Sequence, residues 1–174
     1  VMFGDGVITL GDAVITFEDG ASSNGATRAQ LLNAQGSEQK IGFTHTAGGT
    51  INAANETANL VLKGNYAEKS DDTQKSGGSE LISGSGNDML LIGGGDTADG
   101  GAGNDSIYLT NSNLRELGAV IIFGGGSDTV HNFNGGYGSA SDEIIISDLN
   151  GIEFTANASE LVMRSGDATL TFTG

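Results

Sequence analysis

Short runs of alternating apolar and polar residues, separated by Gly, Asn and Asp, follow one another along most of the chain. From residue 40 onward nearly all of these runs are four to six residues long. An alternating pattern of this length, bounded by turn-forming residues, predicts β-strands and an all-β fold. The spacing is compatible with a sandwich or barrel of short strands, or with a parallel solenoid. The predicted strands are 40–45, 49–53, 59–64, 79–84, 88–93, 105–110, 119–124, 128–133 and 142–147.

The two ends of the chain carry a related pattern. GDGVITL (4–10) is followed directly by GDAVITF (11–17), and each unit reads as a turn followed by an alternating strand. VMRSGDATLTF (162–172) resembles VMFGDGVITL (1–10). This recurrence indicates a unit of a longer tandem array, although a turn followed by an alternating strand is also a pattern that arises by chance.

Three segments interrupt the strand rhythm. ATRAQLLNAQ (26–35) is compatible with a short helix, NSNLRELG (111–118) with a turn of helix, and the polar segment 65–78 with a surface loop. The predicted organisation therefore has three parts: N-terminal alternating strands with a polar linker over 1–40, a β-solenoid over 41–150, and a C-terminal β-hairpin over 151–174 that could begin the next tandem unit.

Composition narrows the possible functions. The 174 residues include 30 Gly and no Pro, which favours many tight turns between uninterrupted hydrogen-bonded ladders. The net charge of −15, from 22 acids and 7 bases, excludes nucleic acid as an expected partner, because phosphate binding needs clustered Lys and Arg. The absence of Cys excludes disulfides and thiolate metal sites, and no apolar run is long enough to span a membrane.

One glycine-rich motif recurs in the second half of the chain. GGAGNDSIY (100–108) fits the nonapeptide G-G-x-G-x-D-x-U-x, in which U is aliphatic, at every fixed position. SGSGNDMLL (83–91) and FGGGSDTVH (123–131) each depart from it only at the first Gly. IGGGDTAD (92–99) is a degenerate unit that is one residue short.

The physical chemistry of this motif points to calcium. Six residues form a turn, the next few form a short strand, and two such units complete one coil of a short right-handed parallel β-roll, or β-solenoid, with core 83–131. Stacked turns bring carbonyl oxygens and carboxylates together, which is unfavourable unless a cation neutralises them. Calcium accepts six to eight oxygen ligands in flexible geometry, whereas magnesium requires a tight octahedron. The alternative is a solvated Gly-Asn-Asp turn without metal.

The repeats resemble the hemolysin-type calcium-binding repeat family, also called RTX (repeats in toxin). The resemblance covers 83–131 and extends to 150, because DTVHNF (128–133) and SDEIIISDL (141–149) look like the cap that follows such rolls. It implies type I secretion from a Gram-negative bacterium and folding in extracellular calcium. It gives Asn87 and Asn104 a backbone role only. It leaves open whether Asp96 or Asp99 is a ligand. The carboxylate and glycine positions of the motif correspond to Asp88, Asp105, Asp128, Gly84, Gly86, Gly101, Gly103, Gly124 and Gly126.

The expected function is a calcium-binding structural module of a large secreted or cell-surface protein, such as an adhesin or surface-layer protein, with neighbouring modules of the same polypeptide as partners. Two alternatives remain: the secretion and folding domain of an exoenzyme such as a protease, lipase or epimerase, and a carbohydrate-binding module that contacts surface glycans. No serine-hydrolase, zinc-protease, phosphate-loop or dinucleotide motif occurs, so the chain is not expected to be an enzyme.

Overall fold

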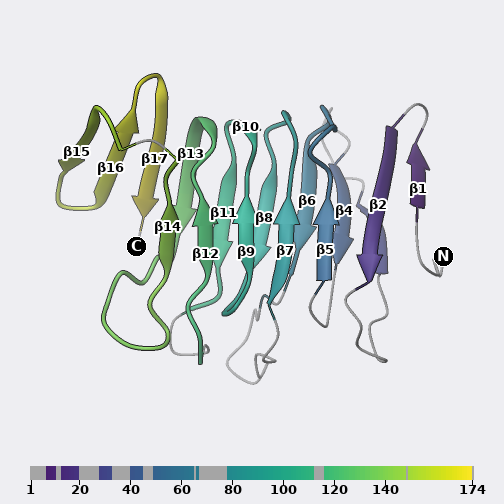
Figure 1. The fold of residues 1–174 in the computed structure, drawn as a ribbon, viewed down its shortest axis with the longest axis horizontal. Helices are drawn as coiled ribbons and strands as arrows, with labels where there is room; N and C mark the ends of the chain where they lie inside the picture. The colour runs from purple at the N-terminus through teal and green to yellow at the C-terminus, as the bar shows by residue number, and fades with distance from the viewer. Residues whose placement is uncertain are drawn as a thin grey trace.

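Two β-sheets lie face to face in the computed structural model, and the strands of both sheets cross the long axis of the molecule (Figure 1). The structure describes residues 49–64, 66, 78–111, 116–147 and 149–173, and the backbone alone of the strands before residue 45. This described part contains strands and no helix, so it also contains no helix that could span a membrane.

The seven-stranded sheet, sheet 1, runs in the order β1 (Val7–Leu10), β2 (Ala13–Asp19), β5 (Gly49–Asn52), β7 (Ser79–Ile82), β9 (Thr97–Asp99), β12 (Val120–Ile122) and β14 (Glu143–Ile145). The ten-stranded sheet, sheet 2, runs in the order β15 (Ile152–Ala156), β16 (Glu160–Ser165), β17 (Ala168–Thr173), β13 (Gly125–His131), β11 (Ser106–Leu109), β8 (Met89–Ile92), β6 (Leu60–Lys63), β4 (Lys40–Thr44) and β3 (Arg28–Leu32), and β10 (Ala102–Gly103) pairs with β13.

The central strands alternate between the two sheets. The chain passes from β5 to β6, then to β7, β8, β9, β11, β12, β13 and β14, and changes sheet at each step. Within each sheet these strands pair in parallel, as β5 with β7 and β8 with β11. Hairpins flank this parallel region, because β1–β2, β3–β4 and β15–β16–β17 pair antiparallel.

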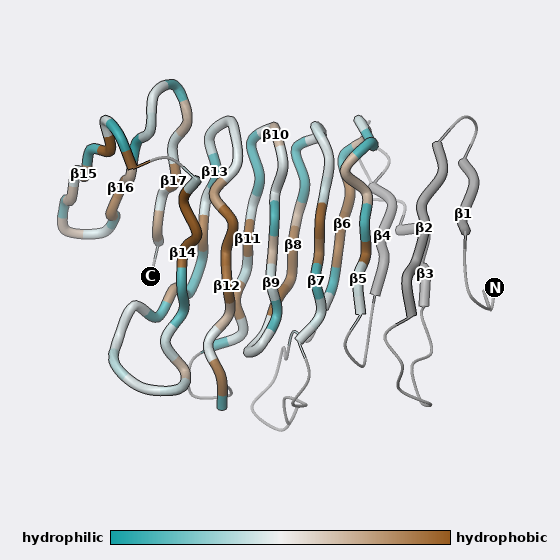
Figure 2. Tube along the Cα trace, viewed as in Figure 1, coloured by the Kyte–Doolittle hydropathy of each residue, from teal (hydrophilic) through white to brown (hydrophobic). Residues whose placement is uncertain are grey.

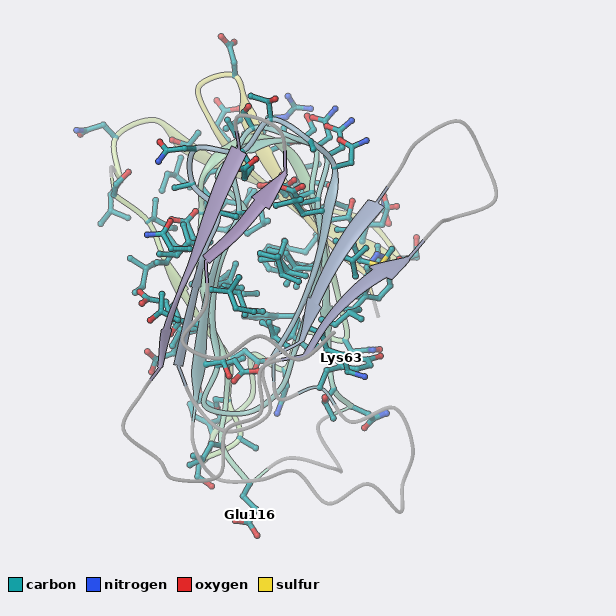
Figure 3. All side chains as sticks on the ribbon, turned by 90° about the vertical axis from the view of Figure 1, so that its right-hand side faces the viewer. Lys63 and Glu116 are labelled. Carbon is teal, nitrogen blue, oxygen red and sulfur yellow. The ribbon has the colours of Figure 1, made fainter. Side chains whose placement is uncertain are left out.

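The parallel strands pair with no shift in register between their apolar positions. The apolar side chains of neighbouring strands therefore form a row that faces the interior. In sheet 2, Leu62 is opposite Leu90, Leu90 is opposite Ile107, and Ile107 is opposite Val130. All four side chains are buried, whereas their neighbours along each strand are partly exposed, as a period of two requires. Figure 2 shows the hydrophobic residues on the strands and hydrophilic residues in many of the turns, and Figure 3 shows the side chains of the two sheets meeting between them.

The sequence pattern located most strands correctly. Each of the nine runs predicted from residue 40 onward overlaps a strand of the structure, and so do the alternating runs at the two ends. The short helix over 26–35 was wrong, since β3 lies there and pairs with β4; sheet pairing outweighs weak local propensity. The sequence pattern also missed β9, β10 and β15, which are short or carry Gly and polar residues.

Two predicted interruptions fall largely outside the described residues. Of the predicted surface loop 65–78, only Tyr66 and Gly78 are described. Of the predicted helical turn at 111–118, residues 112–115 lie outside the described part, and Glu116 and Leu117 form a bend.

Candidate metal-binding turns

The three glycine-rich turns stack in one column. The first (83–88) connects β7 to β8, and the second (100–105) connects β9 to β11 and contains β10. The third (123–128) follows β12 and includes the start of β13, so each crosses from sheet 1 to sheet 2. The turns are hydrogen-bonded to one another through their backbones. The N–H of Ala102 donates to the carbonyl of Gly84 at 2.8 Å, and the N–H of Gly125 donates to that of Gly101 at 2.9 Å. The third turn joins the column although 23 residues separate Asp128 from Asp105.

Close stacking explains the glycines of the motif. A Cβ atom built on Gly103 would overlap with the carbonyl oxygen of Gly86, and one built on Gly126 would overlap with that of Gly103. Gly103 and Gly126 also have φ values of 131° and 103°, a region that residues with a side chain rarely adopt. Gly84, Gly101 and Gly124 meet carbonyl oxygens of the preceding turn in the same way. A larger residue at these positions would force the turns apart.

The motif aspartates form a ladder that runs through the column. The N–H of Leu60 donates to Oδ1 of Asp88 at 2.7 Å, the N–H of Asp88 to Oδ1 of Asp105 at 2.8 Å, and the N–H of Asp105 to Oδ1 of Asp128 at 2.9 Å. Each carboxylate therefore accepts the backbone N–H at the matching position of the preceding turn. This places three carboxylates on successive turns in one line.

A second ladder, made by asparagine, runs beside the first in the opposite sense. The N–H of Asn87 donates to Oδ1 of Asn59 at 2.7 Å, the N–H of Asn104 to Oδ1 of Asn87 at 2.8 Å, and the N–H of Ser127 to Oδ1 of Asn104 at 2.9 Å. Sequence reasoning had assigned only a backbone role to Asn87 and Asn104 and missed these side-chain bonds. The available signal was the Asn-Asp pair repeated at a spacing of 17 residues.

The aspartates of this column are buried with like charges nearby. Asp88, Asp105 and Asp128 are each at least 97% buried. Burial raises the pKa of Asp105 from 3.8 to about 7, against the hydrogen bond from Asp88, and the charges of Asp128, Asp88 and Asp99 add to the rise. Burial likewise raises the pKa of Asp128 to about 6, against the hydrogen bond from Asp105, and the charge of Asp99 adds to it.

The carboxylate of Asp105 has an oxygen that lacks a partner. Oδ2 of Asp105 is buried and has no hydrogen-bond partner among the described residues. It lies so close to Gly100 that a Cβ atom there would come within 2.5 Å of it. A buried carboxylate oxygen without a donor is costly, unless the group takes up a proton or a cation approaches it.

The degenerate repeat contributes one acid to this column and not the other. Asp99 ends β9 at the start of the middle turn, and its Oδ1 accepts the N–H of Gly101 at 2.9 Å. Asp96 lies instead in the turn from β8 to β9. There it is fully buried, and its carboxylate accepts the N–H groups of Ser79 at 2.7 Å and Gly93 at 2.8 Å. Asp96 is therefore a structural acceptor in a different turn.

The atoms of the column that could bind a metal ion are all oxygens. Within the described residues, no three His, Cys, Asp or Glu side chains converge in the manner of an all-side-chain metal site. Carboxylates and main-chain carbonyls remain, and these are the hard ligands that calcium prefers. The unpartnered Oδ2 of Asp105 is a ligand atom of this type, and it is available to a proton or to such a cation.

Comparisons with known proteins give no match. No family model fits the chain, and no curated protein or solved structure is similar to it at a significant level.

Proposed function

We propose that this chain is a calcium-binding structural module whose central strands form a short right-handed parallel β-roll. Strands that alternate between two sheets, joined by stacked glycine-rich turns, support this architecture. The proposal agrees with the resemblance of the motif to RTX repeats. It makes the protein part of a secreted or cell-surface bacterial protein that folds in extracellular calcium.

The observation that carries the proposal is the buried, unpartnered Oδ2 of Asp105 between two other buried carboxylates. Asp105, its neighbours Asp88 and Asp128 in the ladder, and the main-chain carbonyls of the turns would hold calcium. A bound divalent cation would neutralise their charges and keep the carboxyl groups deprotonated. Asp99 adds negative charge at the same turn and would strengthen the attraction for a cation.

Calcium binding would be linked to folding. The turns contain few apolar side chains, and their ligand groups come together only when the coils stack. A single site at a calcium concentration 100 times its Kd stabilises the fold by about 2.7 kcal/mol. A few sites therefore provide a stabilisation comparable with that of a whole small domain.

The decisive experiment compares thermal unfolding in EDTA, in millimolar calcium and in millimolar magnesium. We expect a large, calcium-specific rise in Tm for the unmodified chain. The variant Asp105→Asn should lose most of this rise, because it removes the charge of the carboxyl group that carries the unpartnered oxygen. Isothermal titration calorimetry of both proteins gives the binding directly.

Asp96→Asn is the matched control. This aspartate is equally buried, but its carboxylate accepts backbone N–H groups in another turn. The control should lower Tm in EDTA and leave the calcium-induced rise intact. An unmodified chain with the same Tm in EDTA and calcium would show that the asparagine and aspartate ladders hold the turns without metal.

A further inference from the structure

The two sheets end unevenly at the C-terminal end of the molecule. Beyond the neighbouring strands β12 and β13, sheet 1 continues with β14 alone, whereas sheet 2 continues with β17, β16 and β15. Figure 1 shows β16 and β15 extending past β14. At the other end the sheets are even, because β2 and β1 follow β5, and β4 and β3 follow β6. Sheet 2 thus overhangs sheet 1 by two strands at one end only.

The inner face of this overhang is apolar and only partly covered. Strand pairing places Phe154 beside Met163, and Met163 beside the core residue Leu170; Leu161 pairs with Phe172 in the next row. Leu170, Met163 and Phe172 are buried. Towards the edge of sheet 2 the apolar side chains become exposed to solvent: the exposed fraction is 40% for Leu161 and 64% for Phe154. Large apolar side chains on the inner face of a sheet are normally covered by a second layer.

The backbone of the same end is open as well. β14 is the last strand of sheet 1 and β15 the last of sheet 2, so each has one edge without a partner strand in the described structure. Open strand edges are templates for pairing with another chain. We call this end of the molecule, where sheet 2 overhangs sheet 1 by β16 and β15, the step. The step offers two open strand edges and an apolar inner face, and a partner that fits it must pair with both edges and cover the face.

We propose that the step is a docking surface for a second copy of this chain, related by a two-fold axis parallel to the strands. A rotation of 180° about this axis reverses the order of the strands along the molecule and exchanges the positions of sheet 1 and sheet 2. The overhanging strands β16 and β15 of each copy then lie beyond β14 of the other copy, where its sheet 1 is two strands shorter than its sheet 2. β15 of one copy then lies beside β14 of the other, and the reverse also holds. Phe154 and Leu161 of both copies meet in the interior. The contact is isologous and closes at two copies.

Strand counts and directions favour this arrangement over a head-to-tail stack. In a head-to-tail stack, the N-terminal end of one copy would face the step of the next. Neither sheet overhangs at the N-terminal end, so the two missing strands of sheet 1 at the step would not be replaced. β15 runs in the same direction as β13, because two antiparallel pairings and one parallel pairing connect them. Successive strands of the two sheets run in opposite directions (Figure 1), so the two-fold axis makes β15 and the second β14 an antiparallel pair.

Analytical ultracentrifugation of the 174-residue chain in calcium buffer tests the proposal. Over a range up to about 100 µM, which detects micromolar dissociation constants, we expect a single species with twice the mass of one chain. The double variant Phe154→Lys/Leu161→Lys should raise the Kd of the dimer at least about tenfold, because it buries charge in an apolar contact. The control Leu117→Lys changes an equally exposed leucine away from the step and should leave the dimer intact.

Hydrogen exchange locates the contact, since the amides of β14 and β15 should gain protection in the dimer and lose it in the double variant. A monomer throughout this concentration range would overturn the proposal. So would a dimer that the double variant does not weaken. Open-ended oligomers would overturn it in favour of head-to-tail stacking.

Discussion

The backbone N–H of Asp88 donates a hydrogen bond of 2.8 Å to Oδ1 of Asp105 on the next turn, while Oδ2 of Asp105 is buried without a hydrogen-bond partner in the described structure. One oxygen of this carboxylate thus holds two turns together, and the other is available to a proton or a cation. The same residue can therefore link the stability of the fold to pH and to calcium.

In the absence of metal, the protein should be more stable at pH 5 than at pH 8. Burial raises the pKa of Asp105 from 3.8 in the unfolded chain to about 7, and that of Asp128 to about 6. A raised pKa means that the folded state binds the proton more tightly, so this contribution is fully present below 3.8 and is lost as the pH rises through about 6 to 7. Urea midpoints measured in EDTA at both pH values test the sign.

Calcium should reverse this trend, because it binds the deprotonated carboxylates. Asp105→Asn should flatten the pH dependence in EDTA. Greater stability at pH 8 than at pH 5 without metal would contradict the raised pKa values.

Gly103→Ala should destabilise the fold more than Gly138→Ala does. Both glycines have positive φ, 131° and 121°, so each substitution introduces backbone strain of about 1–3 kcal/mol. Only the Cβ atom at position 103 also meets the carbonyl of a stacked turn, whereas nothing lies near the one at position 138. Overpacking at position 103 should add about 1–3 kcal/mol to the loss. Equal losses in the free energy of unfolding would show that the turns are loosely stacked.

The asparagine ladder should contribute measurably to stability. Asn87→Ala removes the acceptor for the N–H of Asn104 and should lower the free energy of unfolding by about 0.5–1.5 kcal/mol. Ser85→Ala, at an exposed position of the same turn, is the control and should have little effect. Denaturant titrations at a fixed calcium concentration make the comparison. If both variants have the same stability, the side-chain bond is replaced by water at no cost.

The two faces of β8 should respond very differently to truncation. Leu90→Ala opens a cavity in the buried row between Leu62 and Ile107 and should cost about 2–5 kcal/mol. Leu91→Ala, one residue along on the partly exposed face, should cost less than about 1 kcal/mol. Chemical unfolding of the two variants measures the difference, and similar losses would refute the register of the strand.

The positions of most strands and the polar composition of the turns followed from the sequence alone. A period of two in runs such as DMLLIG (88–93) determines which side chains can enter a core, because alternate residues of a strand point to opposite faces. The repeated Gly-x-Gly-Asn-Asp pattern likewise indicated where the backbone turns and where carboxylates gather. Both are local properties, and neighbouring residues are enough to determine them.

Only the tertiary structure decided which turns meet and how their side chains are used. It brought Asp128 into line with Asp105 across 23 residues, separated Asp96 from Asp99, and gave Asn87 and Asn104 their acceptor role. It placed β3 in a sheet where the local sequence was compatible with a helix, and it left Phe154 and Leu161 uncovered at the end of the molecule. These outcomes depend on register and on the number of strands in each sheet. Both are set by pairing between residues that are distant in the chain, which no local pattern specifies.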